Sequence, residues 1–187
     1  GRHYPMAQVV WARYIGHAGV ALVFVWIHWR QRPWRSARPR ELFLFLALHP
    51  EGKTREQIGL AFWPEASAAQ LRNSFHVTLH HVRKALGRSD AIAIDRGRYR
   101  LAPALSPWCD ALEFARQAKD ALRTVKGRGD AEGALSAALE LYRGPLGEGM
   151  ELGEWASDTR LHLGRLAADL LWALAELRLG RGDAAAA

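Results

Sequence analysis

The sequence predicts a mainly α-helical fold with a small β component, arranged as two domains. Residues 8–29 are rich in Val, Ile and Trp and indicate strands; three helix patterns and a short alternating segment follow. Beyond residue 107 the composition becomes rich in Ala, Leu and Glu, which favours helices. We therefore expect a first domain at residues 1–102 and a helical second domain at residues 108–187.

The positive charge of the chain is concentrated in the first predicted domain. The formal net charge is +7; residues 1–104 hold 16 Lys and Arg against six Asp and Glu, and residues 105–187 hold 10 against 13. Seven of the eight histidines also lie in the first part. A basic module of this kind typically binds nucleic acid, because neutralising phosphates releases counterions. A solvated basic surface is the alternative.

The amino-terminal segment is expected to form a small sheet. Gly16 and Gly19 interrupt the β-rich residues 8–29, which is typical of two strands joined by a turn. The longest apolar run, residues 18–27, is shorter than the ~20 residues that span a bilayer, and it lacks a signal-peptide pattern. Cys109 is the only cysteine, so an internal disulfide is excluded. We expect a cytoplasmic protein without membrane contact.

Two helices are expected between residues 36 and 62. Helix one is predicted at residues 36–48, with Ser36 as its cap. Helix two starts at Thr54, with Gln57 in the capping-box position, and runs to about Phe62.

The third helix has the clearest pattern in the chain. Ser67 is its expected cap, and Gly87 its stop signal. Apolar residues follow one another at steps of four, four, three and four: Leu71, Phe75, Leu79, Val82 and Leu86. Residues 92–94 and 99–101 then alternate around a Gly-containing turn, which predicts a β-hairpin.

A linker is expected near residues 102–108, and three helices after it, at about residues 110–126, 130–142 and 151–179. A short pattern recurs at the opening of two helices: Gly129, Asp130 and Ala134 return as Gly182, Asp183 and Ala187. Helix pairs with such a start resemble tetratricopeptide repeats, although the period here is longer. We expect the sequence to stop inside a longer array of repeats.

Strands, three helices and a hairpin in this order are typical of a winged helix-turn-helix. In that fold the third helix enters the DNA major groove and the hairpin touches the adjacent backbone. The face of helix three opposite its apolar residues is polar and basic, and no carboxylate occurs between Glu65 and Asp90. The DNA contacts expected on this helix are Arg72, Asn73, His76, Val77, His80, Arg83 and Lys84.

These side chains suit different parts of a DNA duplex. Asn73 can bind adenine through two hydrogen bonds, and Val77 can contact a thymine methyl group. His76 and His80 can donate to guanine or to phosphate. The phosphate backbone is the expected partner of the other basic residues, Arg72, Arg83 and Lys84. Two further groups are expected to reach the backbone: Lys53, Thr54 and Arg55 in a loop and helix start, and Arg96, Arg98 and Tyr99 in the hairpin.

Catalytic and metal functions find less support in the residues. His76 and His80 are four apart and could chelate a metal, but a third ligand of matching type is not evident. Gly52, Lys53 and Thr54 are similar to the end of a phosphate-binding loop, yet they follow a helix rather than a strand. No Ser-His-Asp or paired-carboxylate arrangement can be identified. We therefore expect neither an enzyme nor a bound cofactor or metal; a metal-dependent enzyme is the third alternative.

Several short stretches carry a resemblance to a known family. In the first domain they are Trp34-Arg35-Ser36, Leu46-Ala47-Leu48-His49-Pro50, Phe62-Trp63-Pro64-Glu65-Ala66 and Val82-Arg83-Lys84-Ala85-Leu86-Gly87. In the second they are Ala138-Leu139-Glu140-Leu141-Tyr142-Arg143-Gly144-Pro145-Leu146 and Glu154-Trp155-Ala156. With these stretches, residues 34–187 resemble bacterial activators of the antibiotic regulatory protein type, which join an OmpR-like winged helix to a bacterial transcriptional activator domain.

The resemblance implies binding to tandem promoter repeats, usually as a homodimer on double-stranded DNA, and recruitment of RNA polymerase. The family's helix-three contacts correspond to Arg72, His76, His80 and Arg83 of this chain. At His76, His80 and His81 the family more commonly has small residues or arginine, so the base preference does not carry over. The main alternative is a protein-interaction module in which the helical repeats are the functional surface.

Overall fold

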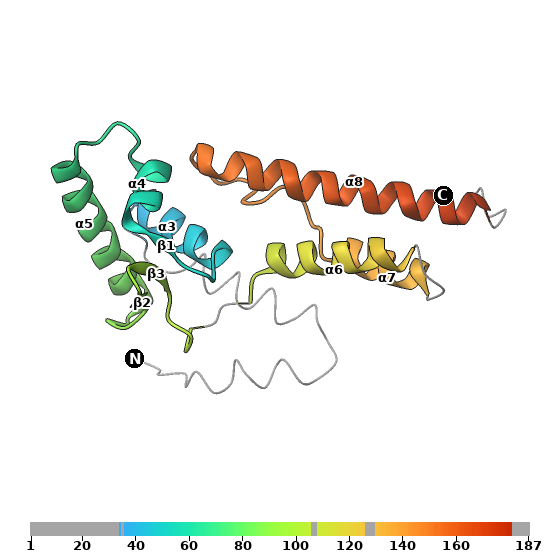
Figure 1. The fold of residues 1–187 in the computed structure, drawn as a ribbon, viewed down its shortest axis with the longest axis horizontal. Coiled ribbons are helices and arrows are strands. Elements are labelled where there is room, and N and C mark those ends of the chain that lie inside the picture. Colours follow the sequence, from blue (N-terminus) through green and yellow to red (C-terminus); the bar gives the residue numbers. More distant parts are fainter. Residues whose placement is uncertain (1–33, 35, 106–107, 126–129, 181–187) are drawn as a thin grey trace.

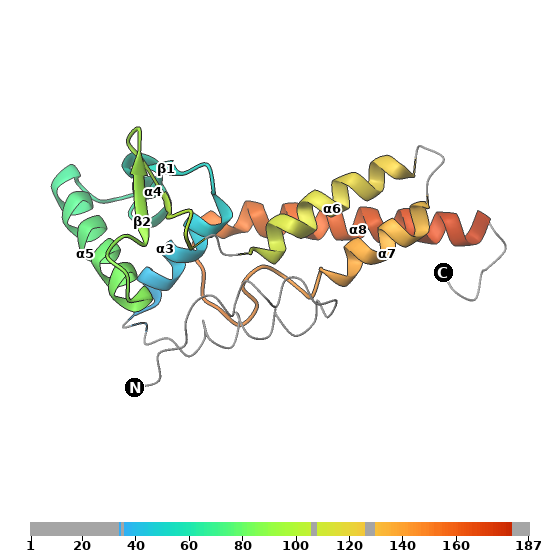
Figure 2. The same cartoon turned by 90° about the horizontal axis from the view of Figure 1, so that it is seen from below.

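The computed structural model describes residues 34, 36–105, 108–125 and 130–180. The described chain is mainly helical with a small antiparallel sheet, and the strands expected at residues 8–29 lie outside it. An amino-terminal unit, residues 36–105, holds three helices and the sheet. A carboxy-terminal unit, residues 108–180, holds three further helices, and the two units lie at opposite ends of the molecule (Figures 1 and 2).

The three helices of the amino-terminal unit follow the expected boundaries. They are α3 (Ala37–Leu48), α4 (Arg55–Phe62) and α5 (Ala68–Leu86). Thr54 caps α4 through a reciprocal pair of hydrogen bonds with Gln57, and Ser67 caps α5 in the same way with Gln70. Gly87 ends α5 in the left-handed conformation that glycine adopts easily. Ser36 precedes α3 as expected, but its side chain makes no capping hydrogen bond.

The predicted hairpin is present and gains a third strand. Strands β2 (Ile92–Asp95) and β3 (Arg98–Leu101) pair in antiparallel register, with Asp95 opposite Arg98. A two-residue strand, β1 (Lys53–Thr54), pairs with the other edge of β3, giving the order β1-β3-β2. The prediction of a loop at Lys53 and Thr54 was therefore wrong: these residues pair with β3, which satisfies their backbone groups, before Arg55 opens the helix.

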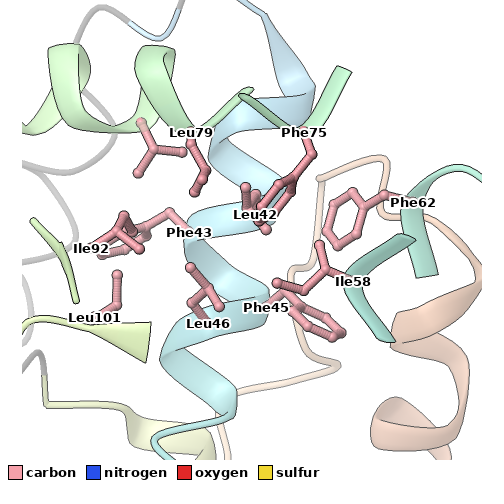
Figure 3. Close-up of a cluster of buried hydrophobic side chains, with 11 residues drawn as sticks. Leu42, Phe43, Phe45, Leu46, Ile58, Phe62, Phe75, Leu79, Ile92 and Leu101 are labelled. Atoms are coloured by element: carbon pink, nitrogen blue, oxygen red, sulfur yellow. The ribbon is translucent and has the colours of Figure 1, made fainter. Parts of the chain in front are cut away.

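One hydrophobic cluster holds the amino-terminal unit together (Figure 3). Helix α3 lies at its centre, and α4, α5 and the hairpin contribute side chains around it. Its buried members are Leu42, Phe43, Phe45, Leu46, Ile58, Phe62, Phe75, Leu79, Val82, Ile92 and Leu101. Of the apolar series predicted on α5, Phe75, Leu79 and Val82 are fully buried, whereas Leu71 and Leu86 are half-buried. The apolar face of α5 is thus fixed toward the core.

The carboxy-terminal unit consists of α6 (Asp110–Thr124), α7 (Ala131–Glu140) and α8 (Ser157–Gly180). They pack around a second hydrophobic cluster that includes Phe114, Leu135 and Leu170. The prediction that the last helix begins at residue 151 was wrong. Residues 151–153 are not helical, and a short 3₁₀ turn, η1 (Glu154–Ala156), precedes α8. Among the described residues, no helix has the length and apolar character needed to cross a membrane.

The two units meet at η1, whose Trp155 packs against the first cluster. Its ring centroid lies 5.3 Å from that of Phe45 and 5.9 Å from that of Phe62. The amino-terminal unit therefore shares part of its aromatic packing with a residue from the other unit.

The burial of α5 gives a direct test of the fold. Replacing Phe75, which is 0% exposed, with alanine should lower the free energy of unfolding by ~3–5 kcal/mol, because a large cavity is left. Val77 lies two residues away on the same helix and is 48% exposed, so Val77→Ala should change it by less than about 0.5 kcal/mol. Urea denaturation followed by circular dichroism measures both; equal losses would contradict the orientation of α5.

Candidate nucleic-acid interface

The outward face of α5 presents a continuous set of polar and basic side chains. We define the α5 outer face by its exposed members: Arg72, Asn73, His76, Val77, His80 and Lys84. The opposite side of the helix is buried at Phe75, Thr78, Leu79 and Val82. Figure 1 shows α5 at the edge of the molecule away from α6, α7 and α8. Six of the seven α5 residues predicted to contact DNA therefore lie open to solvent together.

Arg83, the seventh residue, is placed differently. It is half-buried, and its guanidinium donates a hydrogen bond of 3.5 Å to the carbonyl oxygen of Ile92 in β2. This contact ties the last turn of α5 to the hairpin. Next to it, His81 is half-buried and its ring lies 5.6 Å from that of His80. Helix periodicity alone did not distinguish Arg83 from its exposed neighbours, because the Ile92 carbonyl that it contacts belongs to the hairpin and not to the helix.

The turn of the hairpin projects Arg96 into solvent. Arg96 and Gly97 have φ values of +48° and +76°, so both central residues of the two-residue turn adopt the left-handed conformation. This is the turn type that matches the twist of paired strands, and it favours Asn-Gly. An arginine here carries a conformational cost of about 1–2 kcal/mol.

Arg98 and Tyr99, the other predicted hairpin contacts, are engaged within the unit. The guanidinium of Arg98 donates a 3.1 Å hydrogen bond to the carbonyl oxygen of Gly52, across the sheet. Tyr99 packs edge-on against Phe75, with ring centroids 4.7 Å apart. Gly52 has φ of +78°, and a Cβ there would lie 3.1 Å from the Cβ of Arg98, so glycine permits this close approach.

A small cleft beside the turn adds an arginine that the sequence analysis missed. Its lining is Pro50, Glu51, Asp95, Arg96, Arg98 and Arg100. Arg100 follows Arg96 and Arg98 at a spacing of two, which is the signal that could have identified it, and it pairs with Asp95 at 3.5 Å. The hairpin is therefore basic at its tip, and carboxylates partly neutralise its flank.

The group at the start of α4 is also internally paired. Lys53 Nζ lies 2.9 Å from the Glu51 carboxylate. Burial is the largest single influence on Glu51 and acts to raise its pKa, but the hydrogen bond from Lys53, a backbone hydrogen bond and the charges of Lys53 and His49 together lower it. Thr54 caps α4, and Arg55 pairs with Glu56 at 3.2 Å. A phosphate at this position would compete with existing partners for each of these side chains.

The described residues give little support for a metal site or a reactive thiol. His76 and His80 share the α5 outer face, but across the described residues no group of three or more His, Cys, Asp or Glu could hold a metal ion. Cys109 precedes α6, and burial raises the pKa of its thiol, which disfavours the reactive thiolate.

Comparison with known proteins finds a family of domains to which the carboxy-terminal part is similar. Residues 109–187 match the family model of the bacterial transcriptional activator domain. This match confirms the second domain type that the sequence implied, and supports the resemblance to activators of the antibiotic regulatory protein type. The comparison with curated proteins gives no match.

A solved structure has a similar fold. It is Mycobacterium tuberculosis EmbR in complex with a low affinity phosphopeptide, with a TM-score of 0.65 and 24% sequence identity. The similarity covers 81% of this chain and 42% of the EmbR chain, so this sequence corresponds to less than half of that protein. The likeness extends over both units and shows a shared mainly helical fold with a small sheet.

The turn conformation makes a prediction about stability. Arg96→Asn should raise the free energy of unfolding by up to about 1 kcal/mol, because asparagine tolerates the left-handed conformation better than arginine. Gly97→Ala, at φ +76°, is the matched control and should lower it by about 1 kcal/mol. Thermal denaturation of both variants measures the effect; a stabilising Gly97→Ala would show that the turn differs from the one described.

Proposed function

We propose that the chain is the DNA-binding part of a bacterial transcriptional activator, with the amino-terminal unit acting as a winged helix-turn-helix. The α5 outer face carries this proposal: it is cationic, free of carboxylates and open to solvent beside a basic hairpin turn. A helix of this kind fits the major groove, and a hairpin at its end can reach the neighbouring backbone. The activator domain match supports the regulatory role.

The side chains of the α5 outer face divide between base edges and phosphates. Asn73, His76 and His80 have donors and acceptors that can read base edges, and Val77 offers an apolar contact to thymine. Arg72 and Lys84 supply charge for the phosphates. The Arg83 guanidinium uses one of its donors to bond the Ile92 carbonyl oxygen. We therefore assign it a double role: it positions the hairpin, and it approaches the phosphate backbone of the DNA.

The partners follow from the same assignment. The carboxy-terminal helices, which we interpret as tetratricopeptide-like repeats, would hold two copies together on tandem promoter repeats and contact RNA polymerase. Such an activator works in the cytoplasm, at the chromosome.

Exposed apolar side chains favour a second candidate function, a protein-interaction module. On α8, Leu161, Leu171, Trp172 and Leu179 are 53%, 58%, 70% and 57% exposed. A set of large apolar side chains in solvent on one helix is typical of a surface that another polypeptide covers. DNA binding by the unaltered chain decides between this function and the first.

Salt-dependent binding to duplex DNA tests the proposed function. Affinity should fall ~10³-fold or more between 50 and 200 mM salt, because several phosphate contacts release counterions. Arg72→Ala and Lys84→Ala should weaken binding to all sequences and reduce the salt slope by about 1 each. Arg123→Ala is the charge-matched control, since Arg123 is exposed on α6 in the other unit. If Arg123→Ala costs as much affinity as Arg72→Ala, the assignment of α5 fails.

Base preference needs a separate measurement. Selection of bound duplexes from a random pool identifies the preferred sequence, and Asn73→Ala or His76→Ala should each relax the preference at particular base pairs by about 1–3 kcal/mol. Unchanged preference in both variants would mean that another surface reads the bases.

A further inference from the structure

A buried carboxylate connects the two units. Glu41 of α3 is only 4% exposed, and its Oε1 accepts a 2.6 Å hydrogen bond from the backbone N–H of Gly153, 112 residues later. Its Oε2 accepts a hydrogen bond of 3.4 Å from Arg38. A carboxylate removed from water is strongly unfavourable unless such partners are held in place. The segment 153–156, which we call the joint, is therefore anchored to α3 at its first residue.

An aromatic contact anchors the same segment a second time. Trp155 lies nearly parallel to Phe62, at 23°, and edge-on to Phe45, at 86°. Phe45 and Phe62 themselves pack edge-on at 5.4 Å, and Figure 3 shows them on one side of the buried cluster. Ala156 is fully buried, and a Cβ on Gly153 would lie 3.1 Å from the Trp155 ring. The joint is packed closely on both sides.

The joint lies between α8 of the carboxy-terminal unit and α4 of the amino-terminal unit. Ser157 begins α8 immediately after it, and Phe62 is the last residue of α4. After Phe62, only residues 63–67 separate α4 from α5, and Gly59 allows α4 to approach α5 so closely that a Cβ there would lie 2.7 Å from Leu71. A displacement of α8 would therefore act on α4, and through α4 on the position of α5.

We propose that the joint mechanically couples the carboxy-terminal helices to α5, with Trp155 and Glu41 as positioning residues for DNA binding. This inference rests on the proposed function for its effect on DNA, but not for the coupling of α4 to Trp155. By thermodynamic reciprocity, if a partner that shifts α8 alters the affinity for DNA by some factor, DNA alters the affinity for that partner by the same factor.

The environment of the Trp155 indole nitrogen makes phenylalanine a suitable conservative substitution at this position. This nitrogen is buried and has no hydrogen-bond partner, so the ring is held by its shape and aromatic contacts. Phenylalanine keeps those contacts, whereas leucine keeps apolar volume and removes the aromatic ring. Trp172, which is 70% exposed on α8 and contacts Glu176, is the control position for loss of a tryptophan.

The test compares Trp155→Leu, Trp155→Phe and Trp172→Leu in the full chain by amide hydrogen exchange without DNA. Trp155→Leu should speed exchange of the α4 amides by about tenfold and leave α6 and α7 unchanged, since local opening follows local packing. Trp155→Phe and Trp172→Leu should exchange like the parent chain. Equal α4 exchange in Trp155→Leu and the parent, or equal loosening in Trp155→Phe and Trp155→Leu, would overturn the coupling.

Affinity for duplex DNA at low salt gives the second readout. Trp155→Leu should bind about three- to tenfold more weakly, with the salt slope unchanged because the phosphate contacts remain. Trp155→Phe should restore the parent affinity. A reduced salt slope in Trp155→Leu would mean that phosphate contacts are lost and would overturn the positioning role. If the parent chain does not bind DNA, the proposed function fails while the exchange experiment still decides the coupling of α4 to the joint.

Discussion

The burial of aromatic and aliphatic side chains around α3 is the constraint on which the rest of the amino-terminal unit depends. Because Phe75, Leu79 and Val82 must face that cluster, the rotation of α5 about its own axis is fixed. His76 and His80, which lie between them along the helix, are then exposed to solvent. Figure 1 shows α5 itself at the edge of the molecule away from the carboxy-terminal helices. In this amphipathic helix, the packing of the inner face therefore determines which side chains the outer face presents to solvent.

Features encoded by neighbouring residues could be predicted from the sequence. The capping box at Thr54, the cap at Ser67, the helix stop at Gly87 and the Gly-containing hairpin turn each depend on a few consecutive residues, and the structure has each of them. Strand β1 could not be predicted, because two residues carry no alternation and their partner, β3, lies more than forty residues away along the chain. At the start of the last segment, the backbone N–H of Gly153 likewise bonds to a residue far away along the chain, Glu41, which local patterns do not reveal.

The candidate site shows the same division between local and distant determinants. Periodicity predicted which face of α5 is exposed, and the structure has Arg72, Asn73, His76, Val77, His80 and Lys84 on it. It gave no sign that Arg83 bonds to Ile92, that Arg98 bonds to Gly52 or that Tyr99 packs on Phe75. A basic or aromatic residue near a turn can either bind a ligand or pack within the protein, and its residue type does not tell which. Only the tertiary contacts distinguish the two roles.

The position of Trp155 has a consequence for how proteins with this fold can be recombined. The linker near residue 105 looks like a natural place to cut, yet the aromatic packing around Phe45 and Phe62 is completed from beyond it. A fragment ending there would expose an apolar hollow where the indole had been and would be prone to aggregate. A chimaera that takes its amino-terminal unit from one protein and its carboxy-terminal unit from another must keep an aromatic side chain that packs against Phe45 and Phe62.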